Sequence, residues 1–345
     1  RAEIPASAPS GRSGVLAGLD PDQAHAAETI EGPVLVLAGP GSGKTRMLTH
    51  RLAHLVREHA VPAASCLAVT FTRRATEELA ARLTALGAEG CTVHSFHTLG
   101  LAILRRDGAG VGLGEGFRIA DAAERARVLA GALGVTPAHA HRLLHDVSVL
   151  KRTGTLGGGE AGEALAVLDR LGRAQGWVDF DDLIGLAVQV LETDDAAAAF
   201  WRGRFRHIVA DEFQDVDEMQ YRLLCLLAGA HASLCVIGDP NQAIYGFRGA
   251  DAICFERFLR EFPAARTMRL TRNYRSSFTI VTAAAQVIGE ASDVPRSGAP
   301  ILLYAAEDER AEAEFVASTI EDLLGGHDML AASSVKRATF PPSPG

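Results

Sequence analysis

The segment AGPGSGKT, residues 38–45, decides the fold of this chain. It follows the apolar run PVLVLA (33–38) and precedes a stretch with helical periodicity at 44–58. A glycine-rich loop between a strand and a helix lets backbone N–H groups surround phosphate oxygens, and the helix dipole adds to the attraction. Lys44 can reach the β- and γ-phosphates, and the Thr45 hydroxyl can bind Mg²⁺. The segment therefore predicts a phosphate-binding loop.

The alternative interpretation of this segment is a glycine turn with an incidental lysine. Only three of the 34 basic residues are lysines, namely Lys44, Lys151 and Lys336, so a lysine at this place is informative. The strict motif has Gly where Ala38 stands, which is a small departure. The strand–loop–helix context favours the phosphate-binding interpretation.

Short apolar runs alternate with helical patterns along much of the chain. Strands are predicted at 33–38, 66–70, 91–94, 207–211 and 233–238, with a weaker one at 267–270, and helices at 44–58, 73–86, 95–106 and 217–228. Repeated strand–helix units predict an α/β fold with a parallel sheet covered on both faces. The interval 107–203 holds several helical patterns, a glycine-rich break (154–162) and no convincing strand, and it predicts an inserted helical subdomain.

Composition limits the class of protein. A chain of 345 residues with 48% hydrophobic and 22% charged residues can build about two domains and is not disordered in bulk. No apolar run approaches the ~20 residues that span a bilayer, and no signal peptide is present, so we expect a soluble chain. Five cysteines without a C-x-x-C pair argue against a zinc site or a disulfide framework and for a reducing cytoplasm.

Net charge restricts how the chain could bind nucleic acid. The 34 basic and 42 acidic residues give a formal charge of −8, which excludes a global positive field. A nucleic-acid site must therefore be a local groove that relies partly on stacking.

Two further segments carry candidate chemistry. HIVADEFQD (207–215) places Asp211 and Glu212 at the end of an apolar strand, where α/β proteins bind ligands. Taken alone, such a pair is more often a solvated loop end. Next to a phosphate-binding loop, Asp211 is expected to bind Mg²⁺ and Glu212 to orient or deprotonate the attacking water.

The segment VIGDPNQAIYGFRGAD (236–251) contains a candidate γ-phosphate sensor, Gln242. It also gathers Tyr245, Phe247 and Arg248 in a chain with only 6% aromatic residues, which suggests a stacking surface for bases. The alternative interpretation places both rings in the core.

Eight ordered segments resemble the UvrD/Rep/PcrA-like superfamily 1 DNA helicases, over residues ~19–325. They are LDPDQ (19–23), AGPGSGKT (38–45), VTFTRRA (69–75), TVHSFH (92–97), VDFDDLI (178–184), ADEFQD (210–215), GDPNQAIYGFRGA (238–250) and LTRNYRS (270–276). The resemblance implies a RecA-like P-loop NTPase fold and an ATP-dependent, 3′→5′ single-stranded DNA helicase or translocase that acts at single-strand/duplex junctions. It implies a prokaryotic cytoplasmic protein, associated with the nucleoid when on DNA, with ATP and Mg²⁺ as cofactors and no membrane partner.

The resemblance also implies roles for individual residues. The ATP-binding residues would be Gln23, Ala38, Gly39, Pro40, Gly41, Ser42, Gly43, Lys44, Thr45, Arg46 and Tyr274. The catalytic residues would be Lys44, Glu212, Gln242 and Arg275, and Mg²⁺ would be held by Thr45 and Asp211. Single-stranded DNA would contact Phe71, His94, Tyr245, Phe247 and Arg248.

The expected domain organisation is a linker (1–14), a RecA-like ATP-binding domain (15–106 and 204–276), the inserted helical subdomain (107–203) and the start of a truncated second RecA-like domain with a loose tail (277–345). Within the last segment, helical periodicity near 308–324 places Phe315, Val316, Ile320, Leu323 and Leu324 on one face.

The terminal sequences suggest a piece of something longer. Arg73-Arg74 stands where the family more often has Asn-Lys, which keeps a charge. The helical insertion is shorter than usual, which puts duplex contacts there in doubt.

Three functions are compatible with these features. The first is the N-terminal ATPase half of a DNA helicase. The second is a nucleotide-gated DNA-binding module without motor activity, completed by a partner chain or by a missing C-terminal half, because the family's later motifs are absent. The third is a small-molecule kinase, which leaves the Tyr245–Arg248 cluster unexplained. We expect this chain alone to bind Mg-ATP and single-stranded DNA weakly and not to unwind a tailed duplex.

Overall fold

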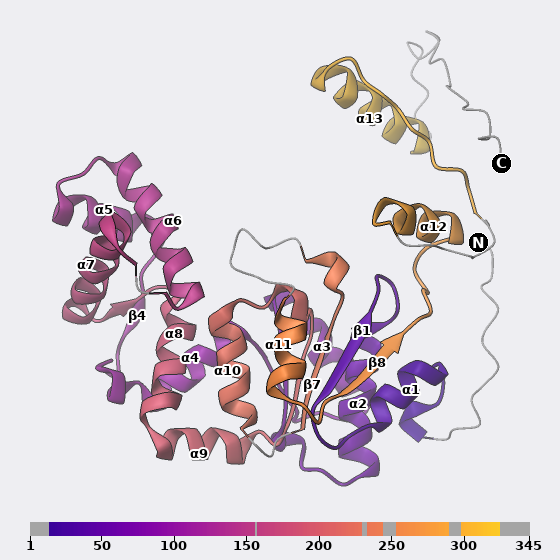
Figure 1. Cartoon of the computed structure of the whole chain (residues 1–345), viewed down its shortest axis with the longest axis horizontal. Coiled ribbons are helices and arrows are strands. Elements are labelled where there is room, and N and C mark those ends of the chain that lie inside the picture. The colour runs from indigo at the N-terminus through magenta and orange to yellow at the C-terminus, as the bar shows by residue number, and fades with distance from the viewer. Residues whose placement is uncertain (1–13, 156, 230–232, 244–252, 290–297, 325–345) are drawn as a thin grey trace. The chain divides into compact units, whose positions relative to one another are not determined.

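A computed structural model describes residues 14–155, 157–229, 233–243, 253–289 and 298–324 of the chain. The chain divides into two compact units between Arg275 and Ser276. The first unit is built on a six-stranded sheet in the order β3-β2-β6-β7-β1-β8, in which every neighbouring pair is parallel (Figure 1). The strands are β1 (Val34–Ala38), β2 (Cys66–Thr70), β3 (Thr92–Ser95), β6 (His207–Ala210), β7 (Ser233–Gly238) and β8 (Arg266–Leu270).

Alternating side chains of the sheet pack into two apolar layers. Leu35, Leu67 and Val236 belong to one buried cluster, whereas their neighbours Val36 and Ala68 belong to the other. Because successive residues of a strand point to opposite faces, a strand buried on both faces is apolar throughout. This is the reason that continuous apolar runs in the sequence became the central strands.

Helices cover both faces of this sheet. One layer is formed by α1 (Pro21–Glu28), α2 (Lys44–Glu58) and α3 (Arg73–Ala85). The other is formed by α4 (Phe96–Asp107), α8 (Asp182–Thr193), α9 (Asp195–Arg204), α10 (Glu218–Ala228) and α11 (Ile253–Glu261). The prediction of an α/β fold with a parallel sheet covered on both faces is confirmed.

A helical group is inserted between α4 and α8. It contains α5 (Ala122–Leu133), α6 (Pro137–Thr153) and α7 (Gly159–Gln175), which enclose a small core of their own around Leu129, Val147 and Leu168 (Figure 1). The glycine-rich break is shorter than predicted, because α7 already begins at Gly159.

The expectation of an insertion without strands was wrong in one detail. Two residues of β4 (Arg118–Ile119) pair in parallel with two residues of β5 (Trp177–Val178). The Arg118 and Ala120 N–H groups donate to the Gly176 and Val178 carbonyls. A pair this short has no alternating pattern that the sequence could show.

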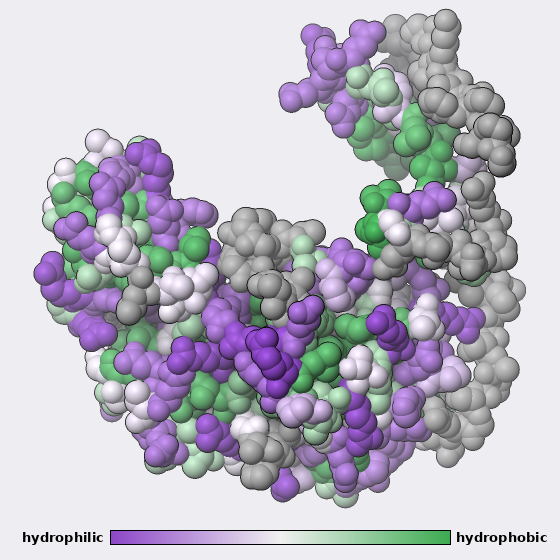
Figure 2. All heavy atoms as spheres, viewed as in Figure 1, coloured by the Kyte–Doolittle hydropathy of each residue, from purple (hydrophilic) through white to green (hydrophobic). Residues whose placement is uncertain are grey.

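The second unit contains α12 (Phe278–Val287) and α13 (Glu309–Leu323). Its described residues expose many apolar side chains, among them Val287, Leu302, Leu303 and Leu323. Hydrophobic residues appear as green spheres in Figure 2. The Phe315 ring of α13 stacks on Tyr304, with ring centroids 3.8 Å apart. The predicted apolar face lies on α13, where Val316, Ile320 and Leu323 are exposed, as is Leu324 directly after the helix.

Over the described part of the chain, no helix has the length and apolar character needed to cross a membrane.

Candidate functional site

Five loops meet at the carboxyl edge of the six-stranded sheet. Parallel strands present their carboxyl ends to one edge, and ligands of open α/β sheets bind there. The loops after β1, β2, β6, β7 and β8 supply the phosphate-binding segment, Phe71, Asp211-Glu212, Asp239 to Gln242 and Asn273 to Arg275, in that order. Sheet order, rather than chain order, therefore brings together residues more than 200 positions apart.

The first five carbonyl groups of the phosphate-binding loop are all hydrogen-bonded. Five successive carbonyl oxygens, those of residues 38–42, each accept a hydrogen bond. The donors are Lys44 Nζ (to Ala38, 3.3 Å), Ser42 Oγ (to Gly39, 2.7 Å), Asn273 Nδ2 (to Pro40, 2.5 Å), the Tyr274 N–H (to Gly41, 2.8 Å) and Gln23 Nε2 (to Ser42, 2.8 Å). In a trans peptide the N–H points opposite to the carbonyl, so bonds that fix these carbonyls also fix the direction of the loop's amide groups, as an anion-binding loop requires.

Two glycines of the loop are required by its conformation. Gly41 has φ +71° and Gly43 has φ +83°, values that side-chain-bearing residues rarely adopt. A Cβ on Gly41 would lie 2.6 Å from Arg275 Cβ, and a Cβ on Gly43 would lie 2.5 Å from Gln23 Nε2. The loop is thus packed against two other segments of the site.

The charged groups of the site lie at the first turn of α2 and the end of β6. Lys44 Nζ is 3.7 Å from Glu212 Oε2, and Thr45 Oγ1 donates to Asp211 Oδ2 at 3.3 Å. Burial, together with the negative charge of Glu212, raises the pKa of Asp211 to about 6. A buried carboxyl that is destabilised as an anion is a favourable position for a cation.

Thr45 and Asp211 suit Mg²⁺ by their chemistry. A hydroxyl and a carboxylate oxygen are hard ligands, and Mg²⁺ in phosphate-transfer sites takes one or two protein oxygens together with phosphate oxygens and water. Among the described residues, no group of three or more His, Cys, Asp or Glu side chains could hold a metal ion by itself. The fit therefore applies to Mg²⁺ delivered with a nucleotide.

Glu212 is held in a strained backbone conformation, with φ +51° in the left-handed region. Residues held in such conformations cluster at functional sites. Gln214, which was not among the predicted site residues, links this residue to the next strand. Its Nε2 donates to Glu212 Oε2 at 2.8 Å, and its Oε1 accepts from the Asp239 N–H at 3.0 Å. Gln242 Nε2 in turn donates to Asp239 Oδ2 at 2.5 Å, which completes a chain of contacts from Glu212 to Gln242.

Three of the residues expected to bind ATP, Gln23, Arg46 and Tyr274, lie outside the loop itself and have contacts of their own. Gln23 forms a capping box with Asp20 at the start of α1, and the Tyr274 hydroxyl donates to Asp20 Oδ2 at 2.6 Å. Arg46 Nη2 donates to the Gly18 carbonyl at 3.0 Å, so its guanidinium is engaged away from the loop. The Arg275 backbone is fixed by Asn273, whose Oδ1 accepts from the Arg275 N–H at 2.9 Å. The sequence had not singled out Asp20 and Asn273, although both lie in the quoted motifs.

A cavity of about 390 Å³ joins the charged groups to a candidate DNA contact. Its lining includes Thr45, Asp211, Glu212, Phe71 and Gln242. The Phe71 ring is partly buried and packs edge-on against Phe96, with ring centroids 5.9 Å apart. One cavity therefore touches both the candidate hydrolysis site and the segment after β2.

The other expected DNA contacts are placed less completely. His94 Nδ1 lies 3.1 Å from Thr98 Oγ1. Burial is the main cause that lowers the pKa of His94, and the positive charge of Arg204 is the second. Tyr245, Phe247 and Arg248 lie outside the described residues.

Sequence reasoning missed Phe180, whose side chain is 55% exposed and packs on the His97 ring at 4.4 Å between centroids. The signal for it was a phenylalanine between acidic residues in VDFDDLI.

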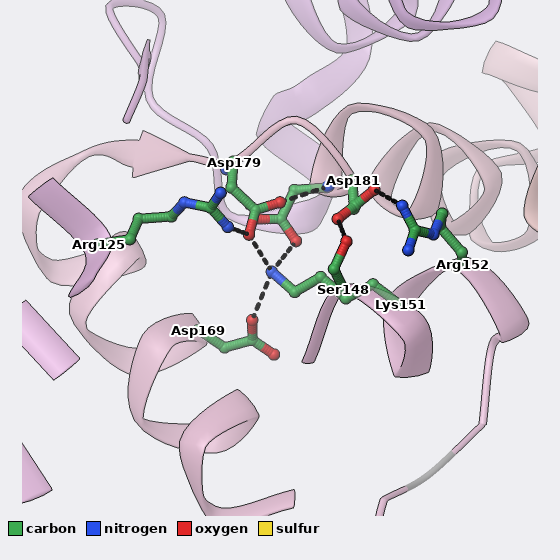
Figure 3. A network of polar contacts seen from close by, with 8 residues as sticks. Arg125, Ser148, Lys151, Arg152, Asp169, Asp179 and Asp181 are labelled. Atoms are coloured by element: carbon green, nitrogen blue, oxygen red, sulfur yellow. Dashed lines mark hydrogen bonds and ion pairs between the residues drawn. The ribbon is translucent and has the colours of Figure 1, made fainter. Parts of the chain in front are cut away.

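Ion pairs and hydrogen bonds anchor Asp179 and Asp181, the residues on either side of Phe180 (Figure 3). Asp179 accepts from Arg125 at 2.7 Å and from Lys151 at 3.0 Å. Asp181 accepts from Ser148 on α6, and Arg152 lies 3.9 Å from it. Lys151, the second of the three lysines, also donates to Asp182 at 2.6 Å and lies 3.6 Å from Asp169. The network ties α6 and α7 to the start of α8.

Comparison with known proteins agrees with this geometry. Residues 19–263 match the UvrD/REP helicase N-terminal domain. The chain is 35% identical over 335 residues to the ATP-dependent DNA helicase PcrA of Leuconostoc citreum, covering 89% of this chain and 45% of that protein. It is 33% identical over 336 residues to the protein of the same name from Bacillus subtilis (90% and 46%), and 34% identical over 338 residues to that of Staphylococcus aureus (88% and 45%).

The chain thus spans a little less than half the length of the curated relatives it matches. The matched segment contains both the phosphate-binding loop and the Asp211-Glu212 pair, so site and similarity coincide, and the chain belongs to the UvrD/REP helicase N-terminal domain family.

Proposed function

We propose that this chain is the ATP-hydrolysing part of a DNA helicase that tracks along single-stranded DNA in the 3′→5′ direction toward single-strand/duplex junctions. The observation that carries the proposal is the cavity shared by Thr45, Asp211, Glu212, Phe71 and Gln242. It places groups suited to phosphate chemistry beside an aromatic ring suited to a base. The names of the PcrA relatives, each an ATP-dependent DNA helicase, support it.

The hydrolytic step would use groups that are already positioned. The loop's amide groups and Lys44 would bind the phosphates, and the anchored carbonyls keep those amides oriented before the nucleotide arrives. Glu212 would accept a proton from the attacking water, since its carboxylate lies 3.7 Å from Lys44 and therefore close to where the phosphates would bind. When Mg²⁺ is bound by Thr45 and Asp211, it would neutralise charge that develops on the phosphates.

Gln214, Asp239 and Gln242 would carry the state of the nucleotide to the DNA side. Gln214 donates to Glu212 and accepts from the Asp239 N–H, which joins the segment after β6 to the segment after β7. The Asp239 side chain in turn accepts a hydrogen bond from Gln242. A change at the γ-phosphate that moves Glu212 would therefore also displace Gln242. Gln242 stands just before the segment that contains Tyr245, Phe247 and Arg248. We propose that these three residues, with Phe71, His94 and Phe180, contact single-stranded DNA by stacking and charge.

We also propose the domain roles. Residues 15–106 and 204–276 would form the RecA-like ATP-binding domain, residues 107–203 the inserted helical subdomain, and residues from 277 part of a second RecA-like domain. The exposed apolar side chains of α12, α13 and the segment between them support the last point, because a soluble domain buries such a surface against further elements.

The test is phosphate release from Mg-ATP by the purified chain, with and without single-stranded oligonucleotide. DNA-stimulated release that disappears in Glu212→Gln, with ATP binding retained, would support the motor function. DNA and nucleotide binding without turnover would instead favour the nucleotide-gated module. Hydrolysis that ignores DNA would contradict both.

A matched pair of variants separates the DNA contact from the fold. Phe71→Ala should weaken binding of single-stranded DNA by ~1–3 kcal/mol irrespective of base sequence, because stacking is tolerant of sequence. Phe71→Trp keeps a flat ring and should retain binding. Loss of thermal stability in Phe71→Ala with unchanged DNA binding would show that the ring serves only the core.

A further inference from the structure

Two of the five cysteines lie side by side on neighbouring strands. Cys66 is the first residue of β2, and Leu67 after it pairs with Thr92 of β3 in parallel register. Cys91 is therefore one step before the first paired residue of β3, opposite Cys66. Both side chains belong to the sheet face that packs on α2 and α3.

This spacing meets the geometric requirement of a disulfide. Neighbouring strands are about 4.8 Å apart, and the Cα atoms of disulfide-linked cysteines are usually ~4.4–6.8 Å apart. Facing residues of parallel strands also direct their Cβ atoms to the same side of the sheet. Both cysteines are free thiols in this structure. Because the spacing and the Cβ directions fit, a disulfide can join the two sulfur atoms without shifting the strands relative to each other.

The two thiols differ in a way that assigns them different chemical roles. Cys66 is fully buried, whereas Cys91 is partly exposed. A hydrogen bond with the Cys91 side chain is the largest cause that raises the pKa of Cys66, and burial is the second. The same hydrogen bond with Cys66 lowers the pKa of Cys91. The exposed thiol is therefore the one that ionises first, and the buried thiol keeps its proton.

We infer that Cys66 and Cys91 form a redox-sensitive thiol pair that hydrogen peroxide converts reversibly into a disulfide. The Cys91 thiolate attacks one peroxide oxygen, the O–O bond breaks, and the leaving hydroxide takes a proton to become water. The Cys91 sulfenic acid is then attacked by the Cys66 sulfur, which loses its proton as the S–O bond breaks and a second water leaves. Two thiols lose two electrons in total, and one peroxide becomes two waters. A dithiol reductant restores the pair.

The link would join the edge strand β3 to its neighbour β2 at their amino ends. The cross-linked positions enclose α3 and the loops on either side of it. Closing such a loop restricts the unfolded chain, so oxidation should raise the melting temperature by a few degrees. The phosphate-binding loop follows β1 at the opposite, carboxyl edge of the sheet, so nucleotide binding should change little.

The experiment is peroxide treatment of the whole purified chain, followed by alkylation under denaturing conditions and mass measurement. The reduced protein should take up five alkyl groups, and the oxidised protein three, with a loss of two hydrogen atoms. Tryptic digestion without reductant should give one linked species that joins peptides 58–73 and 83–105. Reduction should separate the two peptides.

Three variants complete the test. Cys225→Ser removes another partly exposed cysteine, and the Cys66–Cys91 link should still form. Cys91→Ser should keep its four remaining thiols reduced. Cys66→Ala should leave Cys91 as a sulfenic acid that dimedone traps. Five reactive thiols in treated wild-type protein, a link between other cysteines, or oxidation of Cys91 without a link would each overturn the inference.

Discussion

The N–H group of Tyr274 donates a hydrogen bond of 2.8 Å to the carbonyl oxygen of Gly41. This bond connects the segment after β8 to the phosphate-binding loop after β1. Arg275 follows directly, and its Cβ occupies the space that a side chain on Gly41 would need. The two segments therefore constrain each other, and the conformation of the loop depends on residues 273–275 as well as on its own glycines.

Replacing Gly41 by Ala should disturb this contact. The new Cβ would lie 2.6 Å from Arg275 Cβ and 2.9 Å from Asn273 Oδ1, at a backbone φ of +71°. Left-handed backbone costs ~1–2 kcal/mol for a residue with a Cβ, and the clash adds to it. We expect a loss of stability of about 2 kcal/mol or more in urea unfolding without nucleotide, together with weaker ATP binding.

Gly39→Ala is the matched control, because a Cβ there would meet no atom within 4 Å and φ is not positive. Its unfolding free energy should stay within ~0.5 kcal/mol of wild type. Equal destabilisation by both substitutions would show that the Gly41–Arg275 contact is unimportant.

Lys44→Ala and Glu212→Gln should separate binding from hydrolysis. Removing the ammonium takes away a charge-assisted contact to phosphate worth ~1.5–3 kcal/mol, so Lys44→Ala should lower ATP affinity about 10–100-fold. Glu212→Gln removes the base and keeps Asp211 and Thr45, so affinity should remain while turnover falls. Calorimetric titration with Mg-ATP measures the first effect and phosphate release the second. The same loss of affinity in both variants would contradict this division of roles.

Lys151→Met should destabilise the first unit strongly. Burial opposes the charge of Lys151, but Asp182 and Asp179 outweigh it and raise the pKa of the ammonium. Removing the cation leaves Asp182, whose pKa is already raised to about 6, and Asp179 without their shared partner in the interior. Breaking a buried pair in this way typically costs ~3–5 kcal/mol. Denaturant unfolding followed by circular dichroism would measure it.

Arg73→Ala is the comparison for that prediction. Its partner is Glu77 at 2.9 Å, and both side chains are mostly exposed, at 93% and 65%. An exposed pair contributes ~0–1 kcal/mol, so this variant should unfold almost like wild type. A Lys151→Met protein as stable as Arg73→Ala would show that the network of Figure 3 contributes little to stability.

Asp217→Asn should change how stability depends on pH. Burial is the main cause that raises the pKa of Asp217 to about 7, with Arg152 opposing it and Asp181 adding to it. Because the folded state binds this proton more tightly than the unfolded chain, the contribution of Asp217 to wild-type stability falls as pH rises from ~3.9 toward 7. Asn retains the N-cap of α10 without a charge. Relative to wild type, the variant should gain about 2–3 kcal/mol between pH 5 and pH 8.

The measurement is a series of urea unfolding curves at fixed pH values, in which the other titrating groups cancel between the two proteins. Asp217→Ala, which removes both the charge and the cap, should lie below Asp217→Asn at every pH by ~1 kcal/mol. Parallel pH profiles of wild type and Asp217→Asn would show that Asp217 ionises normally in the folded protein.

The sequence by itself determined the α/β class, the six strands of the main sheet and the phosphate-binding loop. These features are local: a buried parallel strand is a short apolar run, and the loop needs its glycines and lysine at fixed spacing. The predicted strand at 66–70 and the predicted helix at 44–58 match β2 and α2 residue for residue.

Only the tertiary structure decided which distant residues meet. The sheet order places β8 beside β1 and β7 between β6 and β1, and this brings Asn273 to Pro40 and Gln214 to Asp239. It also brings Cys66 beside Cys91, and in a separate two-stranded sheet β4 pairs with β5 over two residues each. None of these pairings has a periodic signature, because they depend on backbone hydrogen bonds between strands whose order the hydrophobic pattern does not encode. The sequence contains the residues of the site, and the order of the strands determines which of them touch.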